Sequence, residues 1–591
     1  MPFDANILLK INNLLNQIYG NETAAKAYRD LVILLKKYQA KLNEPASFPD
    51  LDQTDVILIT YGDMLNERGE KPLRTLHQFL QDYTAEIISS IHILPFFPYS
   101  SDDGFSVINY REVNPQLGDW DDIAYLGKDF KLMVDLVANH VSAESEWFIK
   151  YLRGLPPYKD YFIEIVPGAD LSKVFRPRAL PLWREVETAD GKKLVWTTFS
   201  QDQIDLNYRN YKVLLEIIDI MLFYVEKSAK FIRLDAIAYI WKEIGTTCIH
   251  RPEVHWIVQL MRSVLDLVAP AVKLITETNV PHEENISYFG DGTNEAHLVY
   301  NFSLPPLVLY SFYKNSAEQL TKWAKNLELP SGNVSFLNFL ASHDGIGVTP
   351  LSGILDEDEI LQIAHHIEKI GGYVSYKTNA DGSESPYELN INYFDALSDS
   401  SKGVDEEKDL IKKFVCAHAI MLSFKGMPAI YFHSLFGSRS WLEGVNISGQ
   451  KRAINREKFE DENLRQELSD SSSRRNKIFS QLSNLLLIRK QESAFAPSAI
   501  QCILTLHNRL FSLIRYAKGS NSLILCIHNV SSDEVPLRLS LSQLGVNSPD
   551  AINVLTGEKN VKIFKDSLVF KFDSFSFTWI KISCKSDYQP F

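Results

Sequence analysis

Polar residues suited to acid–base chemistry stand at the ends of four short apolar runs in the sequence. They comprise three carboxylic acids, two histidines, an arginine and an amide: Asn139, His140, Arg233, Asp235, Glu277, His343 and Asp344. Each one alone has a modest explanation, because a lone acidic residue after a strand often caps a turn. Together they predict a catalytic site, since several charges are buried at one place only at a cost that function must justify.

A metal-dependent site has little support in the spacing of possible ligands. His343-Asp344 could belong to a metal-binding pair, yet no further histidine stands at a ligand spacing from it. The five cysteines are scattered, and no two of them form a Cys-x-x-Cys pair. A zinc site and a disulfide framework are therefore both unexpected, and a reducing compartment fits better. We expect no metal and no bound cofactor.

Eight apolar runs alternate with helix-like stretches in the central part of the chain. They are Val56–Ile59, Ile87–Leu94, Leu132–Ala138, Phe231–Ile237, Val272–Thr276, His297–Phe302, Val334–Ala341 and Pro428–Phe432. Most are nearly continuous in apolar residues, as parallel strands are when both of their faces are covered. The pattern predicts an α/β fold, a (β/α)8 TIM barrel, in which catalytic residues gather at the C-terminal ends of the strands.

The rest of the chain divides into an extension, two insertions and a terminal module. Residues 1–50 predict a helical extension, with apolar residues such as Leu9 and Leu31 at helical spacing and a Pro-containing linker at its end. Within the barrel, 51–499, the gaps 141–210 and 345–408 are too long for one helix and predict inserted subdomains. Alternating runs after residue 500 predict an all-β module, 500–591. These runs are Phe511–Tyr516, Leu523–Ile527, Val535–Leu539 and Ser567–Ile580.

Charge and hydropathy restrict the partners. The 591 residues include 61 basic and 74 acidic side chains, a net charge of −13, which argues against a nucleic-acid partner. The N-terminal sequence MPFDANILLK lacks the basic region of a signal peptide, and no apolar run reaches the ~18 residues of a membrane span. We expect a cytoplasmic protein with small-molecule partners. A monomer and a homodimer both fit the sequence.

The motifs DLVANH, RLDA, TETN and ASHDG resemble the four signature regions of the α-amylase family, a family of retaining glycoside hydrolases and transglycosylases. The resemblance covers about residues 51–591. It implies that Asp235 is the nucleophile, Glu277 the general acid/base and Asp344 the group that stabilises the distorted glucosyl ring. A non-catalytic relative is disfavoured, because such proteins lose catalytic carboxylates and this chain retains all three.

Further segments are similar to the sucrose phosphorylase-like branch of that family, in which inorganic phosphate is a co-substrate. They are PFFPYSSDDGFSVINYREV, FRPRALPLW, LVWTTFSQDQIDLN and AINRE. The substrate contacts that the resemblance implies are Asp102, Phe105, His140, Phe199, Gln203, Arg233, Asn279, His343 and Arg456. The phosphate or acceptor contacts that it implies are Arg176, Arg178, Tyr387 and Glu388. Without the resemblance, the two arginines of FRPRALPLW would be interpreted as a solvated surface pair.

Two departures from sucrose phosphorylases concern the leaving group. Those enzymes carry His where this chain has Asn279, and Asp-Leu-Tyr-Gln where it has Ser385–Glu388. The helical extension and the run TETNVPHEENISYFG are similar instead to glucosylglycerate phosphorylases of the same branch. This similarity implies reversible phosphorolysis of 2-O-α-D-glucosyl-D-glycerate to α-D-glucose 1-phosphate and D-glycerate. Sucrose, sucrose 6-phosphate or glucosylglycerol phosphorolysis and α-glucoside hydrolysis are the alternatives.

Overall fold

The computed structural model describes most of the chain. The described residues are 3–42, 50–178, 181–379, 382–399, 407–546, 550–558, 563–564, 566–585 and 588. The predicted linker at residues 45–49 lies outside them.

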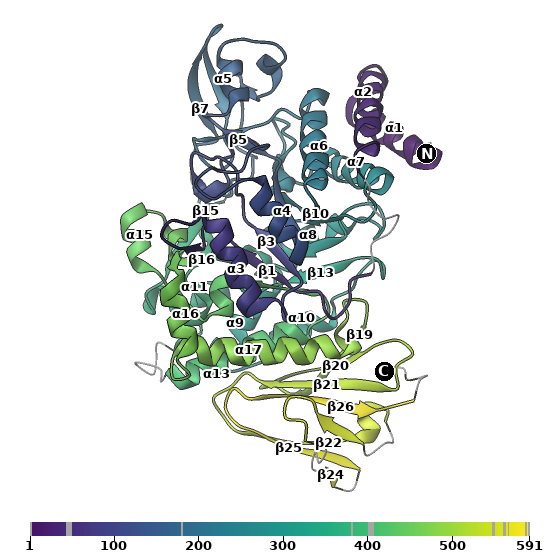
Figure 1. Ribbon diagram of the computed structural model, residues 1–591, viewed down its shortest axis with the longest axis vertical. Coiled ribbons are helices and arrows are strands. Elements are labelled where there is room, and N and C mark those ends of the chain that lie inside the picture. Colours follow the sequence, from purple (N-terminus) through teal and green to yellow (C-terminus); the bar gives the residue numbers. More distant parts are fainter. Residues whose placement is uncertain are drawn as a thin grey trace.

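The centre of the molecule is a closed barrel of eight parallel strands (Figure 1). Around the barrel the order is β1-β17-β13-β12-β11-β10-β4-β3. The bounds are β1 (Ile57–Thr60), β3 (Ser90–Ile93), β4 (Lys131–Val137), β10 (Ala229–Asp235), β11 (Lys273–Thr276), β12 (Leu298–Tyr300), β13 (Ser335–Asn338) and β17 (Met427–Tyr431). Every one of them overlaps a predicted apolar run, so the predicted fold class is confirmed.

Helices cover the outside of the barrel. They include α3 (Pro72–Thr84), α4 (Trp120–Asp129), α6 (Tyr211–Glu226), α7 (Pro252–Val268), α9 (Leu304–Lys314), α10 (Glu318–Lys325), α13 (Glu407–Ser423) and α17 (Arg474–Gln491). Local signals start several of them. Proline stands in the first turn of α3, α7 and α9, where its missing N–H costs nothing, and Asp119 and Asp122 form a capping box on α4.

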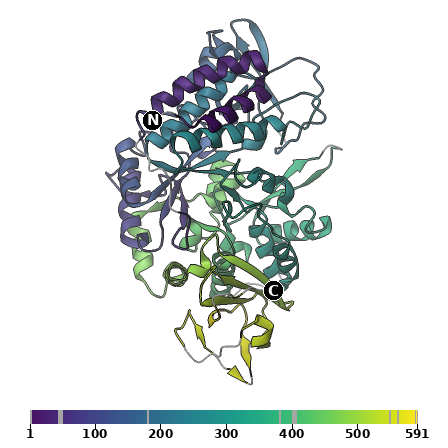
Figure 2. The same cartoon turned by 90° about the vertical axis from the view of Figure 1, so that its right-hand side faces the viewer.

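The N-terminal extension consists of two helices, α1 (Ala5–Tyr19) and α2 (Asn21–Gln39), that pack on α7 and α6 (Figure 2). Leu31 is fully buried in this contact. Leu9 lies in the predicted helix but is 60% exposed, so it stands outside the packed face. The Tyr38 hydroxyl donates to the carbonyl oxygen of Asp219 at 3.0 Å, which fixes α2 to α6.

Both long gaps contain small antiparallel sheets. In the first, β5 (His140–Ser142) pairs with β9 (Gln203–Asp205), and β6 (Glu164–Ile165), β8 (Gly191–Trp196) and β7 (Trp183–Thr188) form a second sheet. In the other, β14 (Ile346–Gly347), β16 (Glu384–Asn390) and β15 (Tyr373–Thr378) form one sheet beside α11 (Glu357–Lys369). Because both insertions follow the C-terminal ends of barrel strands, they extend the walls of the barrel mouth.

The C-terminal part is all-β and lies beneath the barrel in Figure 1. One sheet has the order β19-β20-β21-β26-β23 and the other β22-β25-β24. The bounds are β19 (Ile500–His507), β20 (Leu510–Tyr516), β21 (Ser522–Asn529), β22 (Val535–Ser540), β23 (Ala551–Asn553), β24 (Ile563–Phe564), β25 (Ser567–Phe572) and β26 (Phe577–Ser583). The single predicted strand Ser567–Ile580 is wrong: the chain turns between β25 and β26, where Phe575 takes a φ of 53°.

The C-terminal sheet and the barrel share one core. Phe511, Leu513, Ile524 and Trp579 belong to the same buried cluster as the barrel residues. Arg515 is fully buried at this junction and donates to the carbonyl oxygens of Ser423 and Ala496 at 2.9 and 2.7 Å.

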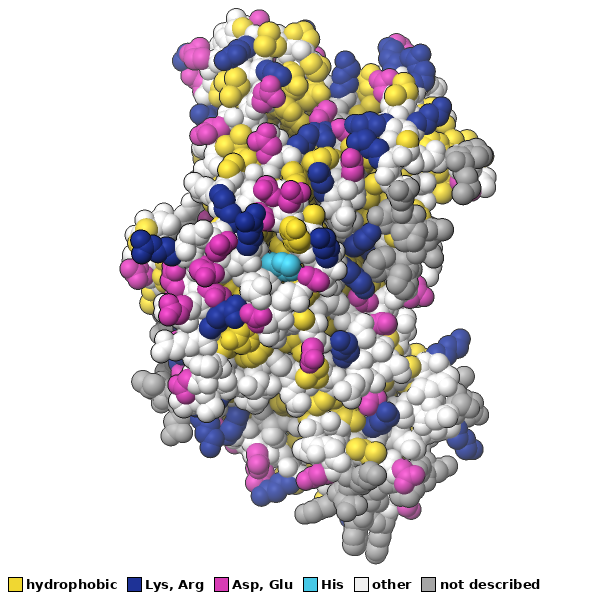
Figure 3. All heavy atoms as spheres, viewed as in Figure 1, with side chains coloured by type: hydrophobic (Ala, Val, Ile, Leu, Met, Phe, Trp, Pro, Cys, Tyr) yellow, Lys and Arg dark blue, Asp and Glu magenta, His cyan; other side chains and the backbone are white. Residues whose placement is uncertain are grey.

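The surface has a mixed character. Acidic and basic side chains are interspersed on the face shown in Figure 3. Over the described ranges, no helix is long and apolar enough to cross a membrane, and no group of three or more His, Cys, Asp and Glu side chains is arranged to hold a metal ion.

Candidate active site

A pocket at the C-terminal ends of the barrel strands contains most of the predicted site residues. Those that line it are Asp102, Phe105, His140, Arg178, Phe199, Gln203, Asp235, Glu277, Asn279, His343, Asp344 and Tyr387. Four others lie elsewhere. Arg233 lines a small neighbouring cavity that shares Glu277, His343 and Asp344 with the pocket. Arg456 contacts the lining residue Asp102, and Glu388 contacts the lining residue Arg452. Arg176 is absent from the lining.

Arg233 anchors the predicted nucleophile. Parallel pairing sets Arg233 of β10 opposite Asp135 of β4, and the two side chains form an ion pair. The same guanidinium donates to Asp235 Oδ1 at 3.0 Å and lies 3.7 Å from Glu277 Oε2. His92 Nε2 lies 2.7 Å from the other oxygen of Asp135. Asp135 therefore has a structural role: it holds the arginine that orients Asp235.

The two central carboxyl groups are arranged to share one proton. Burial raises the pKa of both Asp235 and Glu277, while the positive charge of Arg233 lowers both. The direct hydrogen bond from Arg233 favours the negative charge on Asp235. The negative charge of Asp344 raises the pKa of both groups, so the difference between them comes from Arg233, whose nitrogen is 3.0 Å from Asp235 but 3.7 Å from Glu277 and therefore favours the proton on Glu277. This division gives one nucleophile and one acid from two carboxyl groups.

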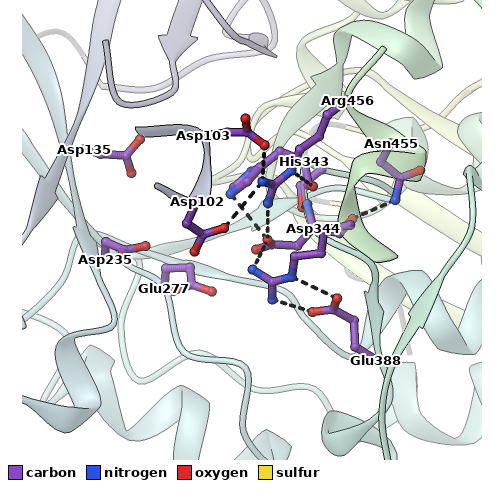
Figure 4. Close-up of polar contacts among 12 residues, drawn as sticks. Asp102, Asp103, Asp135, Asp235, Glu277, His343, Asp344, Glu388, Asn455 and Arg456 are labelled. Carbon is purple, nitrogen blue, oxygen red and sulfur yellow. Dashed lines mark hydrogen bonds and ion pairs between the residues drawn. The ribbon is translucent and has the colours of Figure 1, made fainter. Parts of the chain in front are cut away.

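Asp344 is held ionised by two arginines. Arg452 Nη1 lies 2.5 Å and Arg456 Nη2 3.6 Å from Asp344 Oδ1. These charges hold the pKa of Asp344 well below its ordinary value despite burial. Figure 4 shows Arg456 reaching Asp344 from the side of Asp102 and Asp103, which it also contacts. Both of those aspartates take left-handed backbone conformations, with φ of 52° and 47°.

Glu388 acts on the site through Arg452. Its carboxylate accepts from Arg452 Nε at 3.0 Å and from Nη2 at 2.6 Å, a bidentate pair, and Glu388 is 1% exposed. Its placement in direct contact with an acceptor is therefore not supported by the geometry. Glu388 instead orients the guanidinium that faces Asp344, and it does so from the strand that also carries Tyr387.

The two histidines are neutral parts of the pocket wall. Burial lowers the pKa of His343 to about 3, and its ring stacks on Phe105 with centroids 4.8 Å apart. Burial also lowers the pKa of His140. His140 Nε2 lies 2.9 Å from the carbonyl oxygen of Phe105, so this ring supports the aromatic wall directly. Its contact with a sugar hydroxyl stays a prediction.

The lining of the pocket also includes a cation, a phenol and an amide. Arg178 lines it and has no hydrogen-bond or ion-pair partner among the residues that the structure describes. Burial raises the pKa of Tyr387, so its hydroxyl is a neutral donor. Asn279 Oδ1 is buried without a partner in the described part of the chain. The Arg178 guanidinium and the Tyr387 hydroxyl can donate to a small anion, whereas Asn279 Oδ1 can accept from a hydroxyl.

Comparison with known proteins shows the family to which the chain belongs. Residues 73–351 match the catalytic-domain model of α-amylases. The glucosylglycerate phosphorylase of Spirochaeta thermophila is 50% identical over 530 residues, which cover 89% of both chains. The chain belongs to the α-amylase family. The glucosylglycerate phosphorylase of Escherichia coli K12, another α-amylase-family relative, is 46% identical over 515 residues, 87% of this chain and 91% of that protein.

A solved structure of an α-amylase-family protein supports the same fold. The sucrose 6F-phosphate phosphorylase of Thermoanaerobacter thermosaccharolyticum superposes with a TM-score of 0.70 at 26% identity. The match covers 81% of this chain and 94% of that protein.

Six residues that line this pocket of the α-amylase-family chain were not predicted from the sequence: Ala236, Tyr239, Thr278, Phe302, Gly345 and Arg452. Arg452 lines it, and the available signal was its position in KRAINRE, one turn before Arg456. Tyr239 lines it four residues after Asp235, in the short helix η3 (Ile237–Tyr239) that leaves the end of β10. A tyrosine or an arginine in such a segment has no chemical signature before the fold is known, so neither Tyr239 nor Arg452 could be predicted.

Proposed function

We propose that this protein is a retaining α-glucoside phosphorylase acting reversibly on 2-O-α-D-glucosyl-D-glycerate and inorganic phosphate, with α-D-glucose 1-phosphate and D-glycerate as products. The observation that carries the proposal is the 50% identity to a named glucosylglycerate phosphorylase across 89% of both chains. The sucrose 6F-phosphate phosphorylase, at 26% identity, is a more distant relative.

In the first half of the reaction, the Asp235 carboxylate attacks C1 of the glucosyl group. The bond from C1 to the glycerate oxygen breaks, and its electron pair stays on that oxygen. Glu277 gives its proton to the same oxygen, so D-glycerate leaves with a neutral hydroxyl. Arg233 holds Asp235 in line, and the negative charge of Asp344 supports the positive charge that develops on the ring.

In the second half, an oxygen of hydrogen phosphate attacks C1 from the side that glycerate has left. The ester bond from C1 to Asp235 breaks, and its electron pair returns to the carboxylate. Glu277, now ionised, takes the proton of the attacking phosphate oxygen. Two inversions at C1 give net retention, and both half-reactions balance without a redox partner.

The acceptor side of the pocket supports an anionic leaving group and an anionic attacker. Glycerate carries a carboxylate, and phosphate takes its place in the second step. Arg178 supplies positive charge that no described carboxylate neutralises. A guanidinium can bind either group through paired hydrogen bonds. We propose no metal or cofactor beyond phosphate, and unchanged activity after prolonged EDTA dialysis is the expected result.

The test is a phosphorolysis screen with the purified chain. Glucosylglycerate, sucrose, sucrose 6-phosphate and glucosylglycerol are each incubated with phosphate, and glucose 1-phosphate is measured. Release from glucosylglycerate at the highest kcat/KM supports the proposal. A preference for sucrose, or free glucose formed at the same rate without phosphate, would overturn it in favour of a sucrose phosphorylase or a hydrolase. Asp235→Asn is the inactive control.

A further inference from the structure

A buried ammonium group next to the pocket takes no part in the proposed reaction. The side chain of Lys242 is 3% exposed, and its Nζ lies 2.6 Å from Oδ2 of the buried Asp205. We propose that Lys242 is a positioning residue: its ammonium is an internal cation that binds three oxygens from separate segments and thereby holds the wall of the sugar pocket together.

The ammonium group is surrounded by oxygens. Nζ lies 2.8 Å from Asn139 Oδ1 and 2.6 Å from Asp205 Oδ2, and it also contacts the carbonyl oxygen of Tyr239. An ammonium has three N–H donors, so the three oxygens use its full capacity. Asp205 is completely buried, and a buried carboxylate without a counter-charge is strongly unfavourable.

The three oxygens come from distant parts of the sequence. Asn139 follows barrel strand β4, and Asp205 ends strand β9 of the first insertion. Tyr239 belongs to η3, which begins after Ala236, a residue with a φ of 51°. The cation therefore joins a barrel strand, the insertion and the segment that follows the nucleophile strand.

Each of these segments presents a neighbouring residue to the pocket. Tyr239 lines it directly, and Asn139 Nδ2 lies 3.2 Å from Nδ1 of His140, which lines it too. Gln203, two residues before Asp205 on β9, lines the pocket and lies 3.4 Å from Asp102. Loss of the cation would release three walls of the pocket while leaving Asp235 and Glu277 in place.

Arg209 of the first insertion and Tyr19 of the N-terminal extension both contact the Lys242 segment. Arg209 donates to the Lys242 carbonyl oxygen at 3.3–3.4 Å, and its guanidinium lies 5.2 Å from the centre of the Trp241 ring. Tyr19 of α1 lies on the same indole, with ring centroids 6.5 Å apart. These contacts hold residues 241 and 242 in place, so the Lys242 side chain starts from a fixed backbone position.

The experiment replaces the side chain and returns its charge from solution. Lys242→Ala is expected to lower kcat/KM for phosphorolysis by about 10- to 100-fold, because small displacements of binding groups have effects of this size. n-Propylammonium, which resembles the deleted atoms, is expected to restore activity in a saturable manner. Neutral n-propanol is not. Equal rescue by n-propanol, or wild-type kcat/KM in a folded variant, would overturn the proposal.

Two further variants keep the result interpretable. Lys413 is a buried lysine that does not line the pocket, so Lys413→Ala is the matched control. Adding n-propylammonium should leave the kcat/KM of this control unchanged. If Lys242→Ala is insoluble, Asp205→Asn tests the same contact, with a fall in kcat/KM of the same order expected. Wild-type kinetics of a folded Asp205→Asn chain would overturn the proposal.

The inference rests on the proposed function for its assay, but the two fail differently. If the wild-type chain releases no glucose 1-phosphate from any glucosyl donor, the proposed function is wrong. The cation is then tested by the binding of glucose to the pocket, measured calorimetrically. Glucose affinity that falls in Lys242→Ala and returns with n-propylammonium supports the positioning role, and unchanged affinity overturns it.

Discussion

At the scale of single residues, the carboxylates of the site lie next to arginine guanidinium groups. Asp235 and Asp344 each have an arginine nitrogen within 3.0 Å, whereas the arginine contact of Glu277 is 3.7 Å long. This difference separates the roles of three buried acids. The two with close arginines carry negative charge, and the third holds the proton that the reaction needs.

Arg452 is expected to set the acid limb of the pH profile. Its charge lowers the pKa of Asp344, so this carboxylate stays ionised as the pH falls below the ordinary range. Without that charge the pKa rises, Asp344 is protonated at higher pH, and activity is lost earlier on acidification. Arg452→Gln should therefore shift the acid limb of kcat/KM upward and lower its maximum by about tenfold or more. Lys451→Gln, at the exposed neighbouring position, is the control, and an unshifted limb contradicts the assignment.

Arg178 is expected to serve the anion rather than the glucosyl group. Arg178→Ala should raise the KM for phosphate by about tenfold or more, since charge-assisted hydrogen bonds to phosphate are lost. Slow hydrolysis of the glucosyl donor should persist. Arg176→Ala is the matched control, because Arg176 comes from the same loop but does not line the pocket. If both substitutions raised the KM for phosphate equally, the assignment of Arg178 as the phosphate-binding residue would be wrong.

At the scale of elements, the N-terminal helices owe their place to one packed face. Leu31 of α2 is fully buried, while Ile33 is 69% exposed. Leu31→Ala should destabilise the packing of the extension by about 2–5 kcal/mol, as truncation of a core leucine does. Ile33→Ala should change stability by less than about 0.5 kcal/mol. Hydrogen exchange of the α1 and α2 amides measures the difference, and equal protection in both variants would contradict the packing.

Barrel strands were predictable because their residues are apolar on both faces. Strand β19 was missed since its side chains are mostly half-exposed, and one long apolar stretch concealed the turn between β25 and β26. The catalytic carboxylates were predictable from their positions at strand ends. The pairing of Arg452 with Glu388 was not, because an insertion and a distant 3-10 helix meet only in the folded chain.

At the scale of the whole molecule, the barrel and the C-terminal sheet should unfold together. Their apolar residues form one core, and Arg515 donates to carbonyl oxygens on the barrel side of the junction. We expect a single calorimetric transition, with equal calorimetric and van't Hoff enthalpies. Two resolved transitions would show that the sheet is an independent unit. A chain ending at residue 499 should be insoluble, since it exposes the shared core.

The left-handed backbone of Asp102 and Asp103 has a consequence for how the molecule can be improved. Each residue costs about 1–2 kcal/mol relative to an ordinary conformation, and their contacts with Arg456 hold them there. Selection for thermal tolerance alone would favour glycine at these positions. Such a variant would lose both contacts with Arg456, the guanidinium that also contacts Asp344, so thermal stability and the geometry of the pocket compete within two adjacent residues.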